Sequence, residues 1–233
     1  MNRLIGILGG MGPEATLDLY RHIINLTPAE RDQDHIRTLI YSNPEIPDRT
    51  KALTENGESP LAALLESAKL LESAGVDIIA MPCNAAHYYL EAMRREISVP
   101  ILDMIAETCA ALRNRYPEVE TAGLLASDGA VLSRVYHNAL EAEGIRMLLP
   151  DTADQSYIQS AIAQIKAGIH TEDTRRRLRA IGTRLIQAGA RAIILGCTEV
   201  PLAFDSETFP YPSLNSTRIL AETTIREIRR KAL

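Results

Sequence analysis

A strand followed by a cysteine occurs twice in this sequence, about half the chain apart. Gly75 stands eight residues before Cys83, and Gly189 stands eight residues before Cys197, with an apolar β-rich run after each glycine. Self-similarity at such a distance is typical of a duplicated structural unit. We therefore predict two related halves, each with one cysteine at an equivalent point.

Short β-rich runs alternate with longer amphipathic segments along the chain. Strands are predicted at Leu4–Leu8, Thr38–Ser42, Asp77–Met81, Thr121–Ala126, Met147–Leu149 and Ala192–Leu195, with a further short strand at 100–102. Helices are predicted at Glu14–Leu26, Pro60–Ala74, Ala85–Glu96, Met104–Arg115, Val131–Glu143, Gln155–Ala167, Thr171–Ala188 and Thr217–Ala232. The first and fourth predicted strands are also similar in sequence, which supports the duplication.

This alternation predicts the fold class. It indicates parallel sheets with crossover helices, and the apolar runs at 78–81 and 192–195 are typical of sheets covered on both faces. We predict an α/β protein with two pseudo-symmetric three-layer α/β/α domains, parallel four-stranded sheets and an active site in the cleft between them. Residues 1–102 plus 210–233 would form the first domain and residues 103–209 the second, because Pro-containing segments mark both crossings.

The two repeated cysteines each lie between a buried strand and a helix. Open α/β sheets bind ligands at this end of their strands, so two facing halves would place Cys83 and Cys197 across one cleft. A helix N-terminus favours a thiolate, and we expect the pKa of both thiols to lie below the ordinary ~8.5. Taken singly, each cysteine would more often be a small buried hydrophobe; the repeated setting is what favours a functional role for both. Cys109 lies inside a predicted helix, and we expect it in the core.

Two thiols that face one carbon atom are suited to a particular reaction. A thiolate can remove a proton from one face of an α-carbon while a thiol returns a proton to the other face. The two groups must start in opposite protonation states and exchange them at each turnover, so their titrations are coupled. The pattern therefore favours inversion at a weakly acidic carbon, with backbone N–H groups at helix starts binding a carboxylate.

Charge and composition argue against several partners and locations. The formal net charge is −5, and the sequence has no basic stripe of the kind that binds nucleic acid. No apolar run approaches the ~20 residues of a membrane span, and none resembles a signal peptide. Three cysteines without close pairing suit a reducing compartment, so we expect a cytoplasmic protein that binds neither nucleic acid nor membrane. The five histidines lack metal-ligand spacing, and we expect no metal site.

Three segments closely resemble motifs of the aspartate/glutamate racemase superfamily, and of its aspartate racemase branch in particular. They are residues 9–16 (GGMGPEAT), 82–87 (PCNAAH) and 196–199 (GCTE). The resemblance covers essentially the whole chain. It implies an amino-acid racemase that works without pyridoxal phosphate, any other cofactor or a metal, and that forms a homodimer. It also implies that Cys83 and Cys197 are the catalytic pair, with Cys197 acting on the L-enantiomer and Cys83 on the D-enantiomer.

The same resemblance implies a set of substrate-binding residues. The forked guanidinium of Arg49 suits a substrate carboxylate, although a loop arginine alone is more often a solvated cation. Lys166 ends a predicted helix, where a lysine can simply complement the helix dipole. The full set expected to bind substrate is Met11, Gly12, Arg49, Asn84, Ala85, Ser127, Lys166, Thr198 and Glu199.

Three other features leave alternatives open. The segment Gly9–Gly12 lacks the spacing of a dinucleotide-binding motif, which favours a backbone amide cradle for a carboxylate. His87 either pairs with the Cys83 thiol four residues earlier or is a hydrogen-bonded helix histidine. Asn215 stands where the family often carries aspartate; this difference could alter substrate preference, and the residue could cap the last helix.

We therefore predict a cofactor-independent racemase of a dicarboxylic amino acid, with aspartate as the first candidate substrate and glutamate as the second. A related isomerase of the maleate or hydantoin type is one alternative. A non-catalytic protein that binds acidic amino acids is another, and it would show no exchange of the substrate α-proton.

Overall fold

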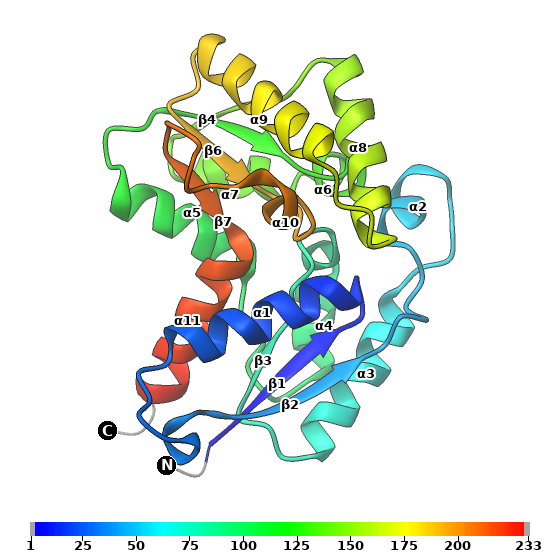
Figure 1. The fold of residues 1–233 in the computed structure, drawn as a ribbon. Coiled ribbons are helices and arrows are strands. Elements are labelled where there is room, and N and C mark those ends of the chain that lie inside the picture. Colours follow the sequence, from blue (N-terminus) through cyan, green and yellow to red (C-terminus); the bar gives the residue numbers. More distant parts are fainter. Residues whose placement is uncertain (1–2, 231–233) are drawn as a thin grey trace.

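The computed structural model describes residues 3–230, and strands alternate with helices along them (Figure 1). The strands are β1 (Leu4–Gly9), β2 (Arg37–Ser42), β3 (Ile78–Ala80), β4 (Thr121–Leu125), β5 (Arg146–Leu148), β6 (Ala192–Leu195) and β7 (Ser213–Asn215). The α-helices are α1 (Pro13–Leu26), α2 (Arg49–Thr54), α3 (Leu61–Ser73), α4 (Leu90–Glu96), α5 (Met104–Arg115), α6 (Asp128–Leu132), α7 (Val135–Ala142), α8 (Thr152–Lys166), α9 (Glu172–Gln187), α10 (Val200–Phe204) and α11 (Ser216–Arg230). Two 3-10 helices, η1 (Asp32–Asp34) and η2 (Ala85–Tyr89), complete this part of the chain. The predicted α/β class is confirmed.

The strands form two parallel sheets with equivalent topology. The order is β2-β1-β3 in the first sheet and β5-β4-β6-β7 in the second. Thus β1, β2 and β3 correspond to β4, β5 and β6, as the duplication predicts. Gly75 and Gly189, which precede β3 and β6, both have positive φ (76° and 109°), a conformation that glycine adopts without steric cost.

The first sheet has three strands, so the prediction of four strands in each sheet is wrong for this half. The fourth position is occupied by Ile101 alone, which makes a single parallel bridge with Ile79. The chain cannot extend this pairing, because Asp103 immediately caps α5 by accepting hydrogen bonds from two backbone N–H groups of its first turn. Pro100 on the other side has no N–H to donate.

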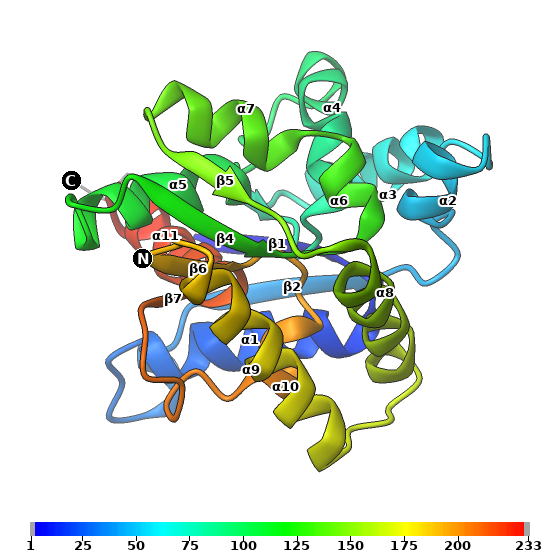
Figure 2. The same cartoon turned by 90° about the horizontal axis from the view of Figure 1, so that it is seen from above.

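Helices cover both faces of each sheet (Figure 2). In the first half, α1 and α11 pack on one face and α3 and α4 on the other. In the second half, α5 and α7 pack on one face, and α8, α9 and α10 pack on the other. Successive residues of β6 therefore contribute to opposite cores, because side chains alternate along a strand.

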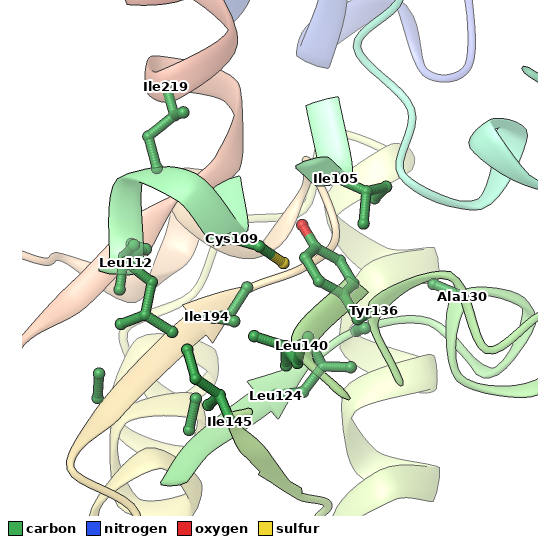
Figure 3. Close-up of a cluster of buried hydrophobic side chains, with 14 of the residues drawn as sticks. Ile105, Cys109, Leu112, Leu124, Ala130, Tyr136, Leu140, Ile145, Ile194 and Ile219 are labelled. Carbon is green, nitrogen blue, oxygen red and sulfur yellow. The ribbon is translucent and has the colours of Figure 1, made fainter. Parts of the chain in front are cut away.

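The expectation for Cys109 is confirmed. It lies in α5 and faces Tyr136, Leu140 and Ile194 in the core of the second half (Figure 3). Burial raises the pKa of this thiol to about 12. Cys109 is therefore a neutral core residue.

Several local elements differ from the predictions. The expected helix at 131–143 is two helices, α6 and α7, because Arg134 adopts a left-handed conformation with φ 57° between them. The expected helix at 85–96 begins as the 3-10 helix η2 and continues as α4. The short elements α2, α10 and β7 were not predicted, because each is too short to show a clear hydrophobic period.

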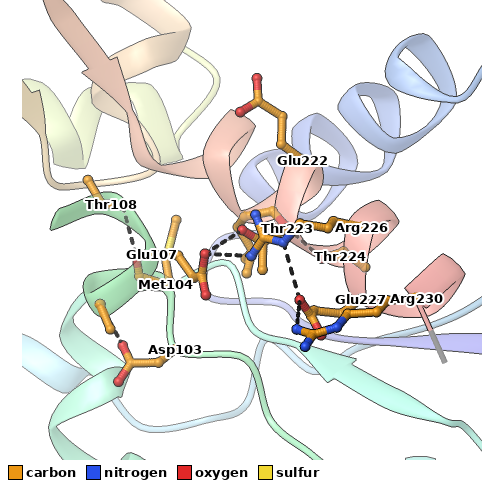
Figure 4. A network of polar contacts seen from close by, with 12 residues as sticks. Asp103, Met104, Glu107, Thr108, Glu222, Thr223, Thr224, Arg226, Glu227 and Arg230 are labelled. Carbon is orange, nitrogen blue, oxygen red and sulfur yellow. Dashed lines mark hydrogen bonds and ion pairs between the residues drawn. The ribbon is translucent and has the colours of Figure 1, made fainter. Parts of the chain in front are cut away.

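The C-terminal part of the chain contacts both halves. Strand β7 pairs with β6 in the second sheet, and α11 then packs on α1 and α5. Glu107 of α5 accepts hydrogen bonds from Thr223 and Arg226 of α11 (Figure 4). The exact domain limits stay a prediction. None of the helices within residues 3–230 combines the length and apolarity needed to cross a membrane.

Candidate active site

A cavity at the carboxyl ends of the two sheets brings together almost all of the predicted site residues. Its volume is about 310 Å³ when the space open to solvent is included. The lining residues are Met11, Asp48, Arg49, Thr50, Cys83, Asn84, Ala85, Ser127, Lys166, Cys197, Thr198 and Glu199. Of the predicted set, only Gly12 does not line this cavity; it lines the adjacent surface depression together with Lys166. Asp48 and Thr50 line the cavity and were not predicted.

The two cysteines reach this cavity from equivalent places. Cys83 follows β3 and precedes η2, and Cys197 follows β6 and precedes α10. Both are free and buried, with 6% and 8% of their surfaces exposed. The duplication therefore places one thiol from each half in the same cavity.

Cys197 is hydrogen-bonded to Glu199. Its Sγ donates to Glu199 Oε2 at 3.0 Å, and the Thr198 hydroxyl donates to the same oxygen at 3.3 Å. Burial, and then the negative charge of Glu199, raise the pKa of Cys197 well above its ordinary value. The expectation of a lowered pKa is therefore wrong for this residue, because burial and a carboxylate outweigh the effect of a short helix.

The glycine-rich segment does form a backbone site for a carboxylate, but the carboxylate belongs to the protein. The Gly12 N–H donates to Glu199 Oε1 at 3.2 Å. The Gly10 N–H donates to the Thr16 hydroxyl at 2.9 Å, and that hydroxyl donates to the Gly12 carbonyl. The Gly12 contact thus joins the first half to Glu199 of the second half, which is 2% exposed, while the Thr16 contacts hold the glycine-rich segment itself.

Two cations line the cavity. Lys166 is the last residue of α8. Burial opposes its charge, but attraction to Glu199 and to the two cysteines outweighs this effect and raises the pKa of Lys166. Its ammonium group therefore remains protonated at neutral pH.

Arg49, the second cation, begins α2 and is held at one end of its guanidinium group. Its Nη1 donates to the carbonyls of Ile46 at 2.9 Å and Pro47 at 2.8 Å. Its Nε is buried and has no hydrogen-bond partner within residues 3–230. One guanidinium edge is thus anchored and the Nε group remains able to donate to a ligand.

Asp48 caps the helix that carries Arg49. Its side chain accepts a hydrogen bond from the Lys51 N–H at 3.0 Å. Burial tends to raise the pKa of Asp48, but this hydrogen bond and the nearby cations Lys166 and Arg49 hold it below its ordinary value. The sequence signal for this cap was an aspartate three residues before Lys51 in a segment interpreted as a loop.

Asn84 is fixed by Tyr136 of the second half and by Ser216 at the start of α11. The Tyr136 hydroxyl donates to Asn84 Oδ1 at 2.7 Å, and Asn84 Nδ2 donates to Ser216 Oγ at 3.3 Å. Ser216 in turn donates to the Leu195 carbonyl at 2.9 Å. All three side chains are buried. Neither Tyr136 nor Ser216 was predicted, because they lie 52 and 132 residues from Asn84 along the chain.

Removal of the Tyr136 hydroxyl should destabilise the protein. In Tyr136→Phe, Asn84 Oδ1 would lose its donor while it remains buried, and we expect the free energy of unfolding to fall by about 1–3 kcal/mol. Urea unfolding followed by circular dichroism measures this change. Tyr88→Phe is the matched control, because Tyr88 is 53% exposed; equal stability of the two variants would contradict a structural role for the Asn84 contact.

His87 does not contact the Cys83 sulfur through a hydrogen bond. Its Nδ1 lies 2.9 Å from the Cys83 carbonyl, and its Nε2 accepts from the Met104 N–H at 3.1 Å. Burial lowers the pKa of His87, which suits the neutral form with the proton on Nδ1. The interpretation as a hydrogen-bonded helix histidine is confirmed.

Ser127 lies in the cavity, whereas Asn215 lies outside it. Ser127 lines the cavity and also caps α6 by accepting from the Ala130 N–H at 3.3 Å. A side chain at Gly129 would meet the Thr50 Cα at 2.9 Å, so α6 and α2 approach closely across the cleft. Asn215 does not line the cavity; its Oδ1 accepts from the Arg218 N–H in the first turn of α11, as a helix cap does.

Sequence and structure comparisons place this chain beside known racemases. The Asp/Glu/hydantoin racemase family pattern matches residues 8–224. The broad-specificity amino-acid racemase RacX of Bacillus subtilis (strain 168) is 30% identical over 226 residues, which cover 95% of this chain and 96% of that protein. The aspartate racemase of Picrophilus torridus is 33% identical, with a TM-score of 0.84 over 97% of this chain and 94% of that chain. The glutamate racemase of Francisella tularensis in complex with D-glutamate is 16% identical, with a TM-score of 0.74 over 99% and 82% of the two chains, and this likeness concerns the fold alone.

Proposed function

Because this chain belongs to the Asp/Glu/hydantoin racemase family and is an amino-acid racemase, we propose that it racemises an acidic amino acid by a two-cysteine mechanism. Cys83 and Cys197 act from opposite sides of the substrate α-carbon. One removes the α-proton as a thiolate, and the other returns a proton as a thiol. Their positions at equivalent strand ends and in one cavity support this role. No cofactor takes part in the proposed reaction.

The unpartnered Nε of Arg49 is the observation that supports an acidic substrate. A buried guanidinium N–H without a partner is costly, and a carboxylate would satisfy it with a charge-assisted hydrogen bond. Lys166 provides a second positive charge in the same cavity. We therefore assign the substrate side-chain carboxylate to Arg49 and Lys166.

The α-carboxylate is assigned to the backbone around the two cysteines. Asn84 and Ala85 line the cavity beside Cys83, and Thr198 lines it beside Cys197. Backbone N–H groups in these positions can bind the α-carboxylate and stabilise the negative charge that spreads onto it when the α-proton is removed. Following the family resemblance, we assign the L-enantiomer to Cys197 and the D-enantiomer to Cys83.

We further expect a homodimer that works in the cytoplasm. The three free cysteines support a reducing compartment, and soluble oligomers are most often symmetric dimers. Sedimentation of the reduced protein measures the number of subunits.

Proton exchange in deuterated water tests the proposed function. Reduced protein is incubated with L-aspartate, without pyridoxal phosphate, and the α-proton is followed by NMR. We expect the α-proton signal to disappear while D-aspartate accumulates. Glutamate and neutral amino acids are tested in parallel, because RacX is a broad-specificity enzyme. Absence of exchange with every acidic amino acid, from folded and reduced protein, would contradict the proposal.

A further inference from the structure

We propose that Glu199 makes the two thiols of the cavity unequal: it holds Cys197 as the thiol, so that the free enzyme rests with its thiolate at Cys83. Glu199 is in this view a positioning residue that sets the proton of Cys197. The inference rests on the proposed two-cysteine mechanism and adds to it which of the two protonation states the empty enzyme adopts.

The hydrogen bonds of Glu199 carry this inference. Oε2 accepts from Cys197 Sγ at 3.0 Å, while Oε1 accepts from the Gly12 N–H at 3.2 Å. The Gly12 contact keeps the carboxylate in place even when the thiol proton leaves. A Cys197 thiolate would then lie beside a buried carboxylate, which is unfavourable because both groups are shielded from water.

Cys83 has no equivalent partner. Within residues 3–230, no acidic side chain accepts a hydrogen bond from the Cys83 sulfur. The residue two positions after Cys83 is the uncharged Ala85, whereas the residue two positions after Cys197 is Glu199. Lys166 attracts a negative charge on either sulfur, on Cys197 more than on Cys83, so the difference between the two thiols comes from Glu199. The charged or titratable groups that surround the two sulfurs in the cavity are Glu199, Lys166, Arg49 and Asp48.

The proton balance follows from this resting state. When the D-enantiomer binds, the Cys83 thiolate takes its α-proton and the Cys197 thiol gives its proton to the opposite face. The product enzyme then has a Cys83 thiol and a Cys197 thiolate beside Glu199. One proton must leave Cys83 and one must reach Cys197, through solvent, before the resting form returns.

This asymmetry cannot be read from the ratio of kcat/KM values in the two directions. The two enantiomers of a free amino acid have equal free energies, so thermodynamics requires equal kcat/KM values for both. The thiols themselves must therefore be measured. Brief alkylation with iodoacetamide over about pH 5.5 to about 10, with each cysteine quantified by mass spectrometry, gives a labelling midpoint for each sulfur.

We expect Cys83 of the wild-type enzyme to be labelled at lower pH than Cys197. Glu199→Gln keeps an oxygen for the Gly12 N–H but removes the charge, and it should lower the Cys197 midpoint by about one pH unit or more. Lys166→Met removes the attracting cation and should raise the Cys197 midpoint. Glu207→Gln is the matched control, because Glu207 is exposed and lies outside the cavity, and it should leave both midpoints unchanged.

A Cys197 midpoint at or below that of Cys83 in the wild type would overturn the proposal. An unchanged Cys197 midpoint in folded Glu199→Gln protein would overturn it too. If Glu199→Gln does not fold, the wild-type order and the Lys166→Met shift decide the question.

The ultraviolet absorbance of the thiolate, in protein with Cys83 and Cys109 both replaced by alanine, checks that reagent access does not set the Cys197 midpoint. Midpoints that behave as expected in a protein without racemase activity would support the Glu199 pairing and refute the proposed reaction instead.

Discussion

Alanine in place of either Cys83 or Cys197 is expected to lower the rate of D-aspartate formation from L-aspartate by at least about 10³-fold. Each variant retains only one of the two groups that inversion needs, since one sulfur must remove the proton and the other must return it. Chiral chromatography of the reaction mixture measures the loss. Both variants should remain folded, because each substitution removes a single sulfur atom that already borders the cavity.

Cys109→Ala is the matched control for both cysteine variants. Cys109 is equally a free, buried cysteine, but it lies in the core of the second half and outside the cavity. Its replacement should leave the racemisation rate within about a factor of two to three of the wild type, since surface and core changes away from a site act mainly on stability. A wild-type rate in folded Cys83→Ala or Cys197→Ala protein would show that the acid-base pair lies elsewhere.

Arg49→Lys is expected to reduce kcat/KM for aspartate by at least about 30-fold, which corresponds to about 2 kcal/mol. Lysine keeps the positive charge but lacks the planar fork, and its three N–H groups share one nitrogen, so it cannot hold the loop carbonyls with one edge while it presents a separate edge to a carboxylate. The Arg49 Nε group that we assign to the substrate would be absent. Initial rates over a range of aspartate concentrations measure the change.

The choice of substrate separates a binding role of Arg49 from a structural one. Alanine has no side-chain carboxylate, so any racemisation of alanine by the wild type should be reduced much less than that of aspartate. Equal losses for both substrates would indicate that Arg49 mainly holds the loop through Ile46 and Pro47. Arg95→Lys is the matched control, because Arg95 is exposed on α4 and does not line the cavity.

Local patterns in the sequence predicted the α/β class and the two related halves, but not the three-stranded first sheet. The equal spacing of Gly75 to Cys83 and of Gly189 to Cys197 predicted two related halves, and the equivalent strand orders agree with it. Strand and helix periods depend on residues close together in the chain, so most elements were located within a few residues. The exceptions were short elements such as α2, α10 and β7.

Most of the residues that line the site were also predictable from the sequence. Parallel strands end at one edge of a sheet, so residues that follow β3 and β6 must meet near the same cleft. This geometry, together with the motif resemblance, predicted ten of the residues that line the cavity. Asp48 and Thr50 were missed because the short helix α2, which brings them to the cleft, was interpreted as a loop.

The sequence by itself determined the two halves, the two cysteines and the residues around them, because these follow from periodicity and from spacing along the chain. Only the tertiary structure decided how those groups are charged and held. Glu199 accepts the N–H of Gly12, 187 residues away, and its other carboxylate oxygen accepts a hydrogen bond from Cys197 Sγ. The helix start beside Cys197 predicted a lowered pKa, but burial and this distant contact produce the opposite shift. A pKa depends on all the charges and solvent within a few ångströms, and that neighbourhood exists only after the two halves have packed together.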